Sequence, residues 1–200
     1  MGDNPVYKDL LIGVVAMQGS FAKHAHSMGK MGIPCLAVRR ADDLKRVDGM
    51  ILPGGESTTM TTLLENEELW DPLDEALKTM PVFGTCAGAI LLGQQVEDDR
   101  VKCFNKIDYR AKRNAYGRQI ESFTTSLVIP KLHYHDFHAV FIRAPKLKEI
   151  GSGVESLAAY GADQVLVQQD HVLAASFHPE LTENSIIHQY FVDEIVLKYR

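Results

Sequence analysis

The sequence predicts an α/β fold with a mostly parallel central sheet and added antiparallel strands. In the first half of the chain, short apolar runs alternate with helix-like segments, and Leu10–Met17 is an unbroken apolar run typical of a strand covered on both faces. This alternation implies parallel strands joined by right-handed crossovers. After about Val101, β-like runs follow one another with short gaps, which favours antiparallel strands added to the same sheet.

The first half is expected to hold four strands and four helices. The strands are expected at Leu10–Met17, Cys35–Val38, Asp48–Leu52 and Pro81–Phe83, and the helices at Ser20–Met31, Ser57–Asn66, Glu67–Thr79 and Ala87–Gln94. Gly32 and Pro34 are stop signals for the first helix. Ser57 is expected to cap the second helix, because a serine hydroxyl accepts from the free amides of a first turn.

The second half is expected to be strand-rich and to close on a helix. The β-like runs are Phe123–Ile129, Ala139–Arg143, Ser156–Tyr160, Gln164–Gln168 and Leu173–Phe177. Asn184–Tyr199 has apolar residues spaced for one buried helical face. The chain shows no repeat, linker or low-complexity stretch, so residues 1–200 are expected to form one domain.

Composition excludes several classes of protein. Lys and Arg number 21 against 26 Asp and Glu, a net charge of −5, which argues against a nucleic-acid-binding protein. No apolar run approaches the roughly 20 residues that span a bilayer, and no signal peptide is visible. Three cysteines without a CxxC pair argue against a disulfide framework, so a cytoplasmic location is expected. A dinucleotide site is disfavoured because no GxGxxG follows a strand, and no cofactor is expected.

Gly84–Gly88 (GTCAG) lies between an apolar strand and a helix and has the spacing of a nucleophile elbow, with Cys86 at its centre. A sharp strand-to-helix turn strains the nucleophile's backbone, and small flanking residues avoid clashes there. A thiol at a helix N-terminus is favoured as the thiolate, and the N–H of Ala87 is placed to donate to an oxyanion. The alternative is a buried structural cysteine, which we expect for Cys35 and Cys103.

Two further motifs supply what a cysteine nucleophile needs. In Ser176–Glu180 (SFHPE), which follows a strand, His178 and Glu180 can point the same way, so the carboxylate sets the imidazole tautomer and leaves the other nitrogen to take the thiol proton. The alternative is a solvated turn. In Pro53–Ser57 (PGGES), glycines at a strand's carboxyl end suit a second oxyanion donor, with Gly55 the better candidate.

A cluster of histidines could form either a metal site or a solvated loop. His133, His135 and His138 lie close to Asp136 in Lys131–His138, and an extended strand would put the first two histidines on one side. No matching ligand set occurs elsewhere, so the solvated loop is favoured and no metal is expected. The remaining histidines have no companion signal and are expected to be structural or exposed: His24, His26, His171 and His188.

The combination of PGGES, GTCAG and SFHPE resembles the class I (triad) glutamine amidotransferases. More narrowly, segments along nearly the whole chain are similar to the glutaminase subunits of pyridoxal 5′-phosphate synthase: Gly13–Gly19, Leu52–Thr58, Phe83–Gly88, Arg113–Gln119, Phe141–Pro145 and Ser176–Thr182. The chain departs from this pattern at the charged Val101–Lys112 and at the histidine cluster.

The resemblance implies a flavodoxin-like three-layer fold and a glutaminase that passes ammonia to a synthase. By position, it implies a triad of Cys86, His178 and Glu180. It implies that Gly54, Gly55 and Glu56 line the glutamine site, that Arg113, Ile142 and Arg143 hold the substrate's amino-acid end, and that Gln18 lies near the synthase interface. The expected partners are L-glutamine and the synthase subunit, in a ring-shaped hetero-oligomer. Two alternatives stay open: the glutaminase of another complex, such as imidazole glycerol phosphate synthase, and a non-catalytic binding protein on the same fold.

Overall fold

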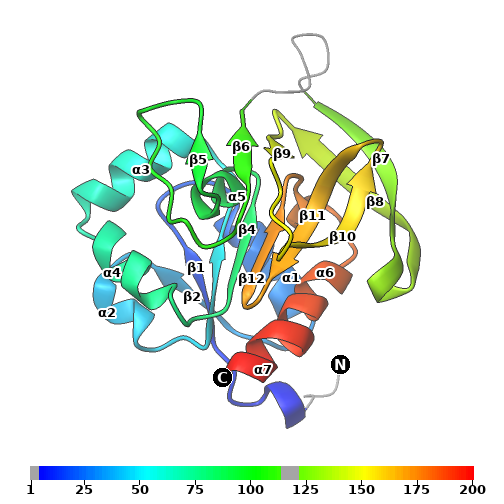
Figure 1. Ribbon diagram of the computed structural model, residues 1–200. Helices are drawn as coiled ribbons and strands as arrows, with labels where there is room; N and C mark the ends of the chain where they lie inside the picture. Colours follow the sequence, from blue (N-terminus) through cyan, green and yellow to red (C-terminus); the bar gives the residue numbers. More distant parts are fainter. Residues whose placement is uncertain (1–4, 114–121) are drawn as a thin grey trace.

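The structure is a computed structural model that describes residues 5–113 and 122–200. At its centre lies a sheet whose strands are ordered β10-β11-β12-β4-β3-β1-β2 (Figure 1). The pairs from β12 to β2 are parallel, and β10 and β11 are antiparallel additions. The bounds are β1 Ile12–Val15, β2 Cys35–Val38, β3 Gly49–Leu52, β4 Val82–Thr85, β10 Glu155–Tyr160, β11 Asp163–Gln169 and β12 Val172–Ala175. The predicted mostly parallel sheet is confirmed.

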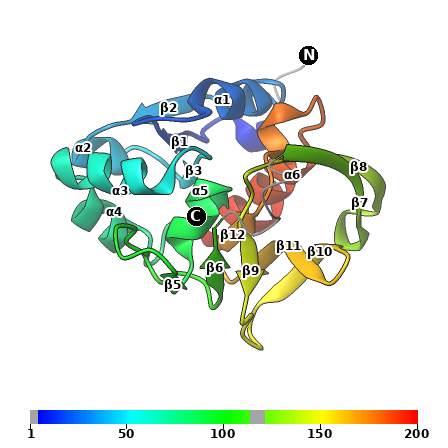
Figure 2. The same ribbon diagram turned by 90° about the horizontal axis from the view of Figure 1, so that it is seen from above.

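Helices cover both faces of this sheet and make three layers (Figure 2). The bounds are α1 Phe21–Gly29, α2 Ala41–Leu44, α3 Ser57–Asn66, α4 Trp70–Ala76, α5 Ala87–Leu92, α6 Ile186–Tyr190, a π-helical turn Phe191–Val196 and α7 Leu197–Tyr199. Helix α1 and the C-terminal helical segment pack on one face, and α2 to α5 pack on the other. None of the helices in the described part of the chain is long and apolar enough to cross a membrane.

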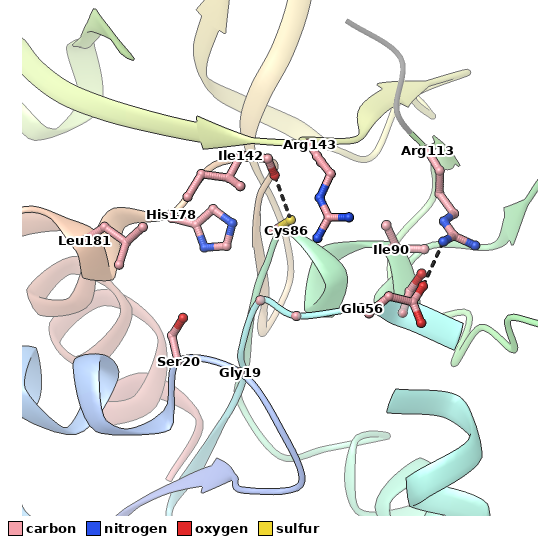
Figure 3. Close-up of a pocket in the computed structure, with 13 residues that line it drawn as sticks. Gly19, Ser20, Glu56, Cys86, Ile90, Arg113, Ile142, Arg143, His178 and Leu181 are labelled. Atoms are coloured by element: carbon pink, nitrogen blue, oxygen red, sulfur yellow. Dashed lines mark hydrogen bonds and ion pairs between the residues drawn. The ribbon is translucent and has the colours of Figure 1, made fainter. Parts of the chain in front are cut away.

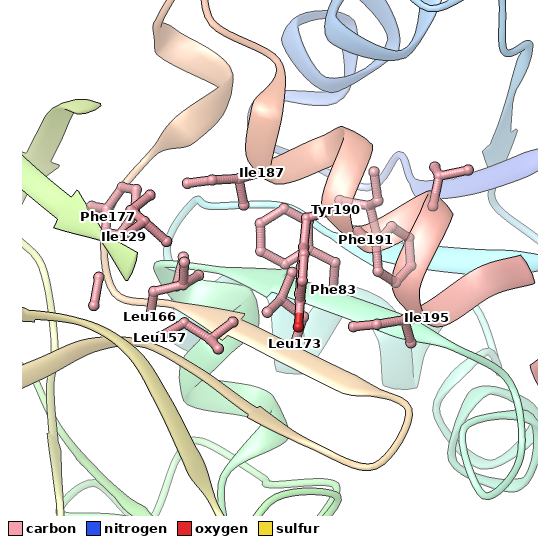
Figure 4. Close-up of a cluster of buried hydrophobic side chains, with 14 of the residues drawn as sticks. Phe83, Ile129, Leu157, Leu166, Leu173, Phe177, Ile187, Tyr190, Phe191 and Ile195 are labelled. Atoms are coloured by element: carbon pink, nitrogen blue, oxygen red, sulfur yellow. The ribbon is translucent and has the colours of Figure 1, made fainter. Parts of the chain in front are cut away.

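The C-terminal helical segment packs as its apolar spacing predicts. Ile187, Phe191 and Ile195 are fully buried, and they pack over side chains of the central sheet that include Phe83 and Leu173 (Figure 4). The rings of Phe83 and Phe191 lie 5.7 Å apart. This layer therefore packs on one face of β4, which ends directly before Cys86.

The prediction that Phe123–Ile129 and Ala139–Arg143 extend the central sheet is wrong. These residues form a separate antiparallel hairpin, β7 (Ser122–Ile129) with β8 (Tyr134–Ile142), beside that sheet (Figures 1 and 2). Burial alternates along β8, and Phe137 and Phe141 enter the core while their neighbours face outward. The hairpin packs only its inner face on the core, so it covers the core from one side. A strand inside the central sheet would be covered on both faces.

Lys131–His138 exposes its three histidines to solvent, as expected, but the expectation of a loop is wrong for most of this segment. A 3₁₀ helix, Pro130–Leu132, leads through the left-handed residue His133 (φ 51°) into β8. His135 and His138 lie on β8 with exposed side chains, on either side of the buried Phe137. Among residues 5–113 and 122–200, no group of three or more His, Cys, Asp or Glu side chains is placed to hold a metal ion.

A small second sheet lies near the charged segment that departs from the family pattern. It consists of β5 (Gln95–Val96), β6 (Arg110–Lys112) and β9 (Lys146–Lys148). Only the end of Val101–Lys112 is therefore a strand; before it, the chain is irregular but buries Phe104 and Tyr109. Of the Arg113–Gln119 motif, only Arg113 lies within the described residues.

Candidate active site

Cys86 lies at the bend between β4 and α5. Its backbone has φ 49° and ψ −102°, a strained conformation for a residue with a side chain. The neighbouring glycines permit the bend: a Cβ on Gly88 would lie 1.9 Å from the carbonyl oxygen of Leu52, and one on Gly84 would lie 2.8 Å from the Gly88 backbone. Ala87 begins α5, so its N–H belongs to the first turn, whose amides have no acceptor within the helix.

His178 and Glu180 lie at the end of the neighbouring strand. Because β12 and β4 are parallel and Ala175 pairs with Thr85, the residues that follow both strands emerge at the same edge of the sheet. Glu180 lies in a 3₁₀ helix, Pro179–Leu181, and its Oε1 is 2.8 Å from Nδ1 of His178. Both side chains are buried, with 6% and 3% of their surface exposed. The pairing predicted for these two residues is present.

The electrostatics of this pair favour an imidazolium next to a carboxylate. Burial alone would lower the pKa of His178, but hydrogen bonds and charge interactions with Cys86 and Glu180 outweigh it and raise the pKa to about 10. Burial alone would likewise raise the pKa of Glu180, but the hydrogen bond to His178 and the nearby His24 lower it to about 2. The carboxylate therefore stays ionised and holds the ring with Nδ1–H toward it, which leaves Nε2 for proton transfer.

The end of hairpin strand β8 reaches over the sulfur. The thiol of Cys86 contacts the carbonyl oxygen of Ile142 at 3.8 Å, and the backbone N–H of His178 donates to the carbonyl oxygen of Val140 at 2.8 Å. Arg143, directly after β8, has a positive φ of 43°. Sequence reasoning placed this segment in the central sheet, yet as a separate hairpin it brings Ile142 and Arg143 to the site.

A pocket of about 230 Å³ opens in front of the sulfur (Figure 3). Its volume lies below the roughly 300–1,000 Å³ of drug-sized sites, which suits a ligand the size of one amino acid. The predicted site residues that line it are Gly54, Gly55, Glu56, Cys86, Arg113, Ile142, Arg143 and His178. Sequence reasoning missed five other lining residues, Gly19, Ser20, Ser57, Ile90 and Leu181, because small or apolar types carry no chemical signal of their own.

Glu56 and Arg113 form the polar side of the pocket. Glu56, not Ser57 as predicted, caps α3: its carboxylate accepts from the N–H groups of Thr58 and Thr59 at 3.1 and 2.7 Å. Burial would raise the pKa of Glu56, but these hydrogen bonds lower it to about 2. Arg113 donates to Glu56 at 2.8 Å and to Asp98 at 2.6 Å. Ser57 is already the first helical residue and its hydroxyl is buried, so the longer, extended Glu56 reaches the amides instead.

The glycine loop between β3 and α3 packs tightly against the imidazole. A Cβ on Gly54 would lie 2.3 Å from Cε1 of His178, so only glycine fits there. The N–H of Gly54 donates to Oγ1 of Thr85 at 3.0 Å, which ties the loop to the end of β4. On the other side of the loop, Nε2 of Gln18 donates to the carbonyl oxygen of Glu56 at 2.5 Å. Gln18 thus holds the loop that carries Gly55 through the carbonyl oxygen of Glu56.

The SNO glutamine amidotransferase family matches residues 14–197. The chain belongs to this family. Curated relatives include the "Pyridoxal 5′-phosphate synthase subunit PdxT" of Carboxydothermus hydrogenoformans, 43% identical over 92% of this chain and 97% of that protein. The protein of the same name from Kosmotoga olearia is 45% identical over 94% of this chain and 98% of its own.

Solved structures agree with the family membership. A crystal structure described as a glutamine amidotransferase has a TM-score of 0.86 and 40% identity, and covers 92% of this chain and 98% of the other. A chain in the structure of PurLQS from Thermotoga maritima, with a TM-score of 0.67 at 14% identity over 93% of this chain and 99% of its own, shares the fold. The three-layer α/β fold of this glutamine amidotransferase is therefore shared well beyond its own family.

Two histidines expected to be structural or exposed lie against the active site. His24 and His188 are fully buried behind Glu180, whereas His26 is exposed. His24 comes from α1 and His188 from α6, so nothing in their local sequence could reveal that they meet. Only the packing of α1 and the C-terminal helical segment on one face of the sheet brings them together.

Proposed function

We propose that this chain is the glutaminase subunit of a pyridoxal 5′-phosphate synthase, formed by one domain over residues 1–200. It hydrolyses L-glutamine to L-glutamate and ammonia and passes the ammonia to a synthase subunit. The observation that supports it most strongly is the buried His178–Glu180 pair beside a strained, glycine-flanked Cys86. The names of the curated relatives support the synthase context, and no feature of the pocket favours the glutaminase of another complex.

The chemistry is acyl transfer in two halves. The Cys86 thiolate attacks the side-chain amide carbon of glutamine, and the N–H groups of Ala87 and Gly55 stabilise the oxyanion, a term worth about 3–4 kcal/mol per donor. His178 protonates the amide nitrogen, the C–N bond breaks and ammonia leaves behind a thioester. His178 then takes a proton from water, which attacks the thioester, and glutamate leaves as the sulfur regains its charge.

The remaining pocket residues hold the substrate's amino-acid end. Arg143 provides a cation beside Cys86, and the ion-paired Glu56 and Arg113 offer one group of each sign. The backbone at Ile142 closes the pocket above the sulfur. Glutamine carries an ammonium and a carboxylate at the end opposite its amide, so a pocket with both signs of charge recognises it.

The synthase partner docks near Gln18 in a ring-shaped hetero-oligomer. The contact of Gln18 with the carbonyl oxygen of Glu56 gives a docked partner a direct route to the Gly54–Gly55 loop. A peptide flip in this loop on docking completes the oxyanion hole, so the isolated subunit is poorly active. The free thiols of all three cysteines suit a cytoplasmic location.

The test is ammonia release from glutamine with and without the purified synthase subunit. Cys86→Ala is expected to abolish release while the far-UV circular dichroism and the melting temperature stay as in the wild type. Cys103→Ala is the matched control, because burial raises the pKa of the Cys103 thiol to about 11 and keeps it inert. A glutamine-like electrophile is expected to label Cys86 in the complex. Full activity in Cys86→Ala, or no label at Cys86, contradicts the proposal.

A further inference from the structure

Behind the triad lies a chain of two fully buried histidines. Nδ1 of His24 is 2.9 Å from Nε2 of His188, and the other ring nitrogen of His24, Nε2, lies 3.6 Å from Oε2 of Glu180. His24 is on α1, His188 on α6 and Glu180 on the 3₁₀ helix after β12. The carboxylate of Glu180 therefore has an imidazole at each oxygen, His178 at Oε1 and His24 at Oε2.

The same ring nitrogen of His24 also reaches the nucleophile strand. It lies 3.2 Å from Oγ1 of Thr85, the last residue of β4 before Cys86. That hydroxyl oxygen accepts the N–H of Gly54 at 3.0 Å. One nitrogen thus faces both the triad carboxylate and the hydroxyl that anchors the glycine loop, so its hydrogen-bonding role affects both halves of the site.

Both histidines are neutral at neutral pH. Burial lowers the pKa of His24 to about 4, against the opposing charge of Glu180, and lowers that of His188 to about 3. The groups that face the two rings are Glu180 and His178 near the 3₁₀ helix, Thr85 on β4, and the apolar ring of Phe83, whose centroid lies 6.4 Å from that of His24. Each ring therefore carries a single proton, and its position decides what the ring can donate.

The contacts select one tautomer for each ring. If His188 carries its proton on Nε2, it donates to Nδ1 of His24, and His24 then presents Nε2–H to Thr85 and Glu180. In the opposite arrangement a lone pair of His24 would face the carboxylate at 3.6 Å, and the N–H at Nδ1 of His188 would be buried without an acceptor among the described residues. A buried donor without a partner is costly, so the Nε2–H form of both rings is favoured.

We propose that His24, oriented by His188, is a positioning residue for the glutaminase reaction. Its Nε2–H donates to the Thr85 hydroxyl that anchors the Gly54 loop, and it turns its positive end toward Oε2 of Glu180, which lies 3.6 Å away and has no hydrogen-bond partner among the described residues. It touches neither substrate nor sulfur and acts only through those two groups. The inference rests on the proposed function, since it assigns His24 a part in that reaction. It makes α1 and the C-terminal helical segment part of the active site's support.

The kinetic test compares His24→Leu with His24→Gln in the complex with the synthase subunit. Leucine fills similar space without a donor, whereas glutamine can place an amide N–H near the position of Nε2. We expect His24→Leu to lower kcat by about 10–100-fold, the effect typical of removing an outer-shell partner, with KM for glutamine within about 3-fold. His24→Gln is expected to recover most of kcat. The control is His26→Leu, an exposed position on the same helix, which is expected to match the wild type.

A second measurement keeps the inference testable whether or not the variants fold or the enzyme turns over glutamine. Nitrogen-15 NMR of histidine-labelled wild-type protein at about pH 7 reports the tautomer of each ring. Neutral Nε2–H forms of His24 and His188 support the proposal. A protonated His24, a proton on its Nδ1, a loss in kcat below about 3-fold in His24→Leu, or equal losses in the leucine and glutamine variants would overturn it. A wild-type complex without glutaminase activity would refute the proposed function instead, and the NMR result would still decide the network.

Discussion

Replacing Glu180 with glutamine removes one charge from the buried pair and keeps the shape of the side chain. The carboxylate lies 2.8 Å from Nδ1 of His178, and only 3% of Glu180 is exposed, so water screens the interaction little. The variant loses the charge that holds the imidazole protonated. Its amide can also turn an NH2 group toward Nδ1, which forces the other ring tautomer and blocks Nε2 as a base.

Two estimates of the interaction energy between Glu180 and His178 agree. The pKa of Glu180 falls from 4.5 to about 2, which corresponds to about 3 kcal/mol of preference for the charged form at this site. Coulomb's law gives about 4 kcal/mol for opposite charges roughly 4 Å apart at an effective dielectric constant near 20. Because each 1.4 kcal/mol is roughly tenfold in rate, we expect Glu180→Gln to lower kcat by about 10²–10³-fold.

The assay is steady-state ammonia release from glutamine by the complex with the synthase subunit. Glu183→Gln is the matched control: Glu183 pairs with Lys30 at 2.5 Å, but its side chain is 95% exposed, and such surface pairs contribute little. We expect the control to keep full activity. A loss below about tenfold in Glu180→Gln, with the protein folded, would refute the reasoning that the carboxylate charge holds His178 in its active form.

Two other predictions follow from the same site. Gly54→Ala is expected to lower kcat/KM at least about 100-fold, because its Cβ would meet His178 at 2.3 Å, while Gly29→Ala, with open space around it, stays active in the same ammonia assay. Because the pKa of His178 is raised, its stabilisation of the fold is complete below about pH 6.5 and disappears as the pH rises through about 10. Because the pKa of Glu180 is lowered, its stabilisation is complete above about pH 4.5 and disappears as the pH falls toward 2. Urea unfolding should therefore show the stability gap between wild type and Glu180→Gln to be widest near pH 5–6; a gap that widens toward pH 9 contradicts this sign.

The motifs of the site could be read from the sequence because each one combines a chemical type with a backbone constraint. GTCAG places small residues around a strained cysteine. Gly84 and Gly88 lie so close to neighbouring atoms that a Cβ at either position would clash with them. Along SFHPE, residues two apart meet on a short turn, and His178 and Glu180 do so. Parallel strands then predict that both motifs emerge at one edge of the sheet.

What the sequence could not predict depends on contacts between distant segments. The β7–β8 hairpin has the alternation of any half-covered strand pair, so its sequence did not distinguish a lid from an addition to the central sheet. Glu56 caps α3 because its backbone is extended at that point, whereas a preference based on residue type selects Ser57. His24 and His188 are 164 residues apart, and only the packing of two helices on one sheet face joins them.

The central sheet and the β7–β8 hairpin both contribute to the active site, so the residues that hold its side chains in place come from distant parts of the chain. On the sheet side, Cys86 follows β4 and His178 follows β12. His24 of α1 faces the Glu180 carboxylate that contacts His178, and His188 of α6 contacts His24 in turn. On the hairpin side, the carbonyl oxygen of Ile142 contacts the sulfur, and the carbonyl oxygen of Val140 accepts the backbone N–H of His178. The glycine loop lies between the two, held by Thr85 on one side and by Gln18 on the other. If the synthase docks near Gln18 as proposed, its contact acts on the glycine loop, because Gln18 is only partly buried and donates to the carbonyl oxygen of Glu56, whereas His178 and Glu180 are buried.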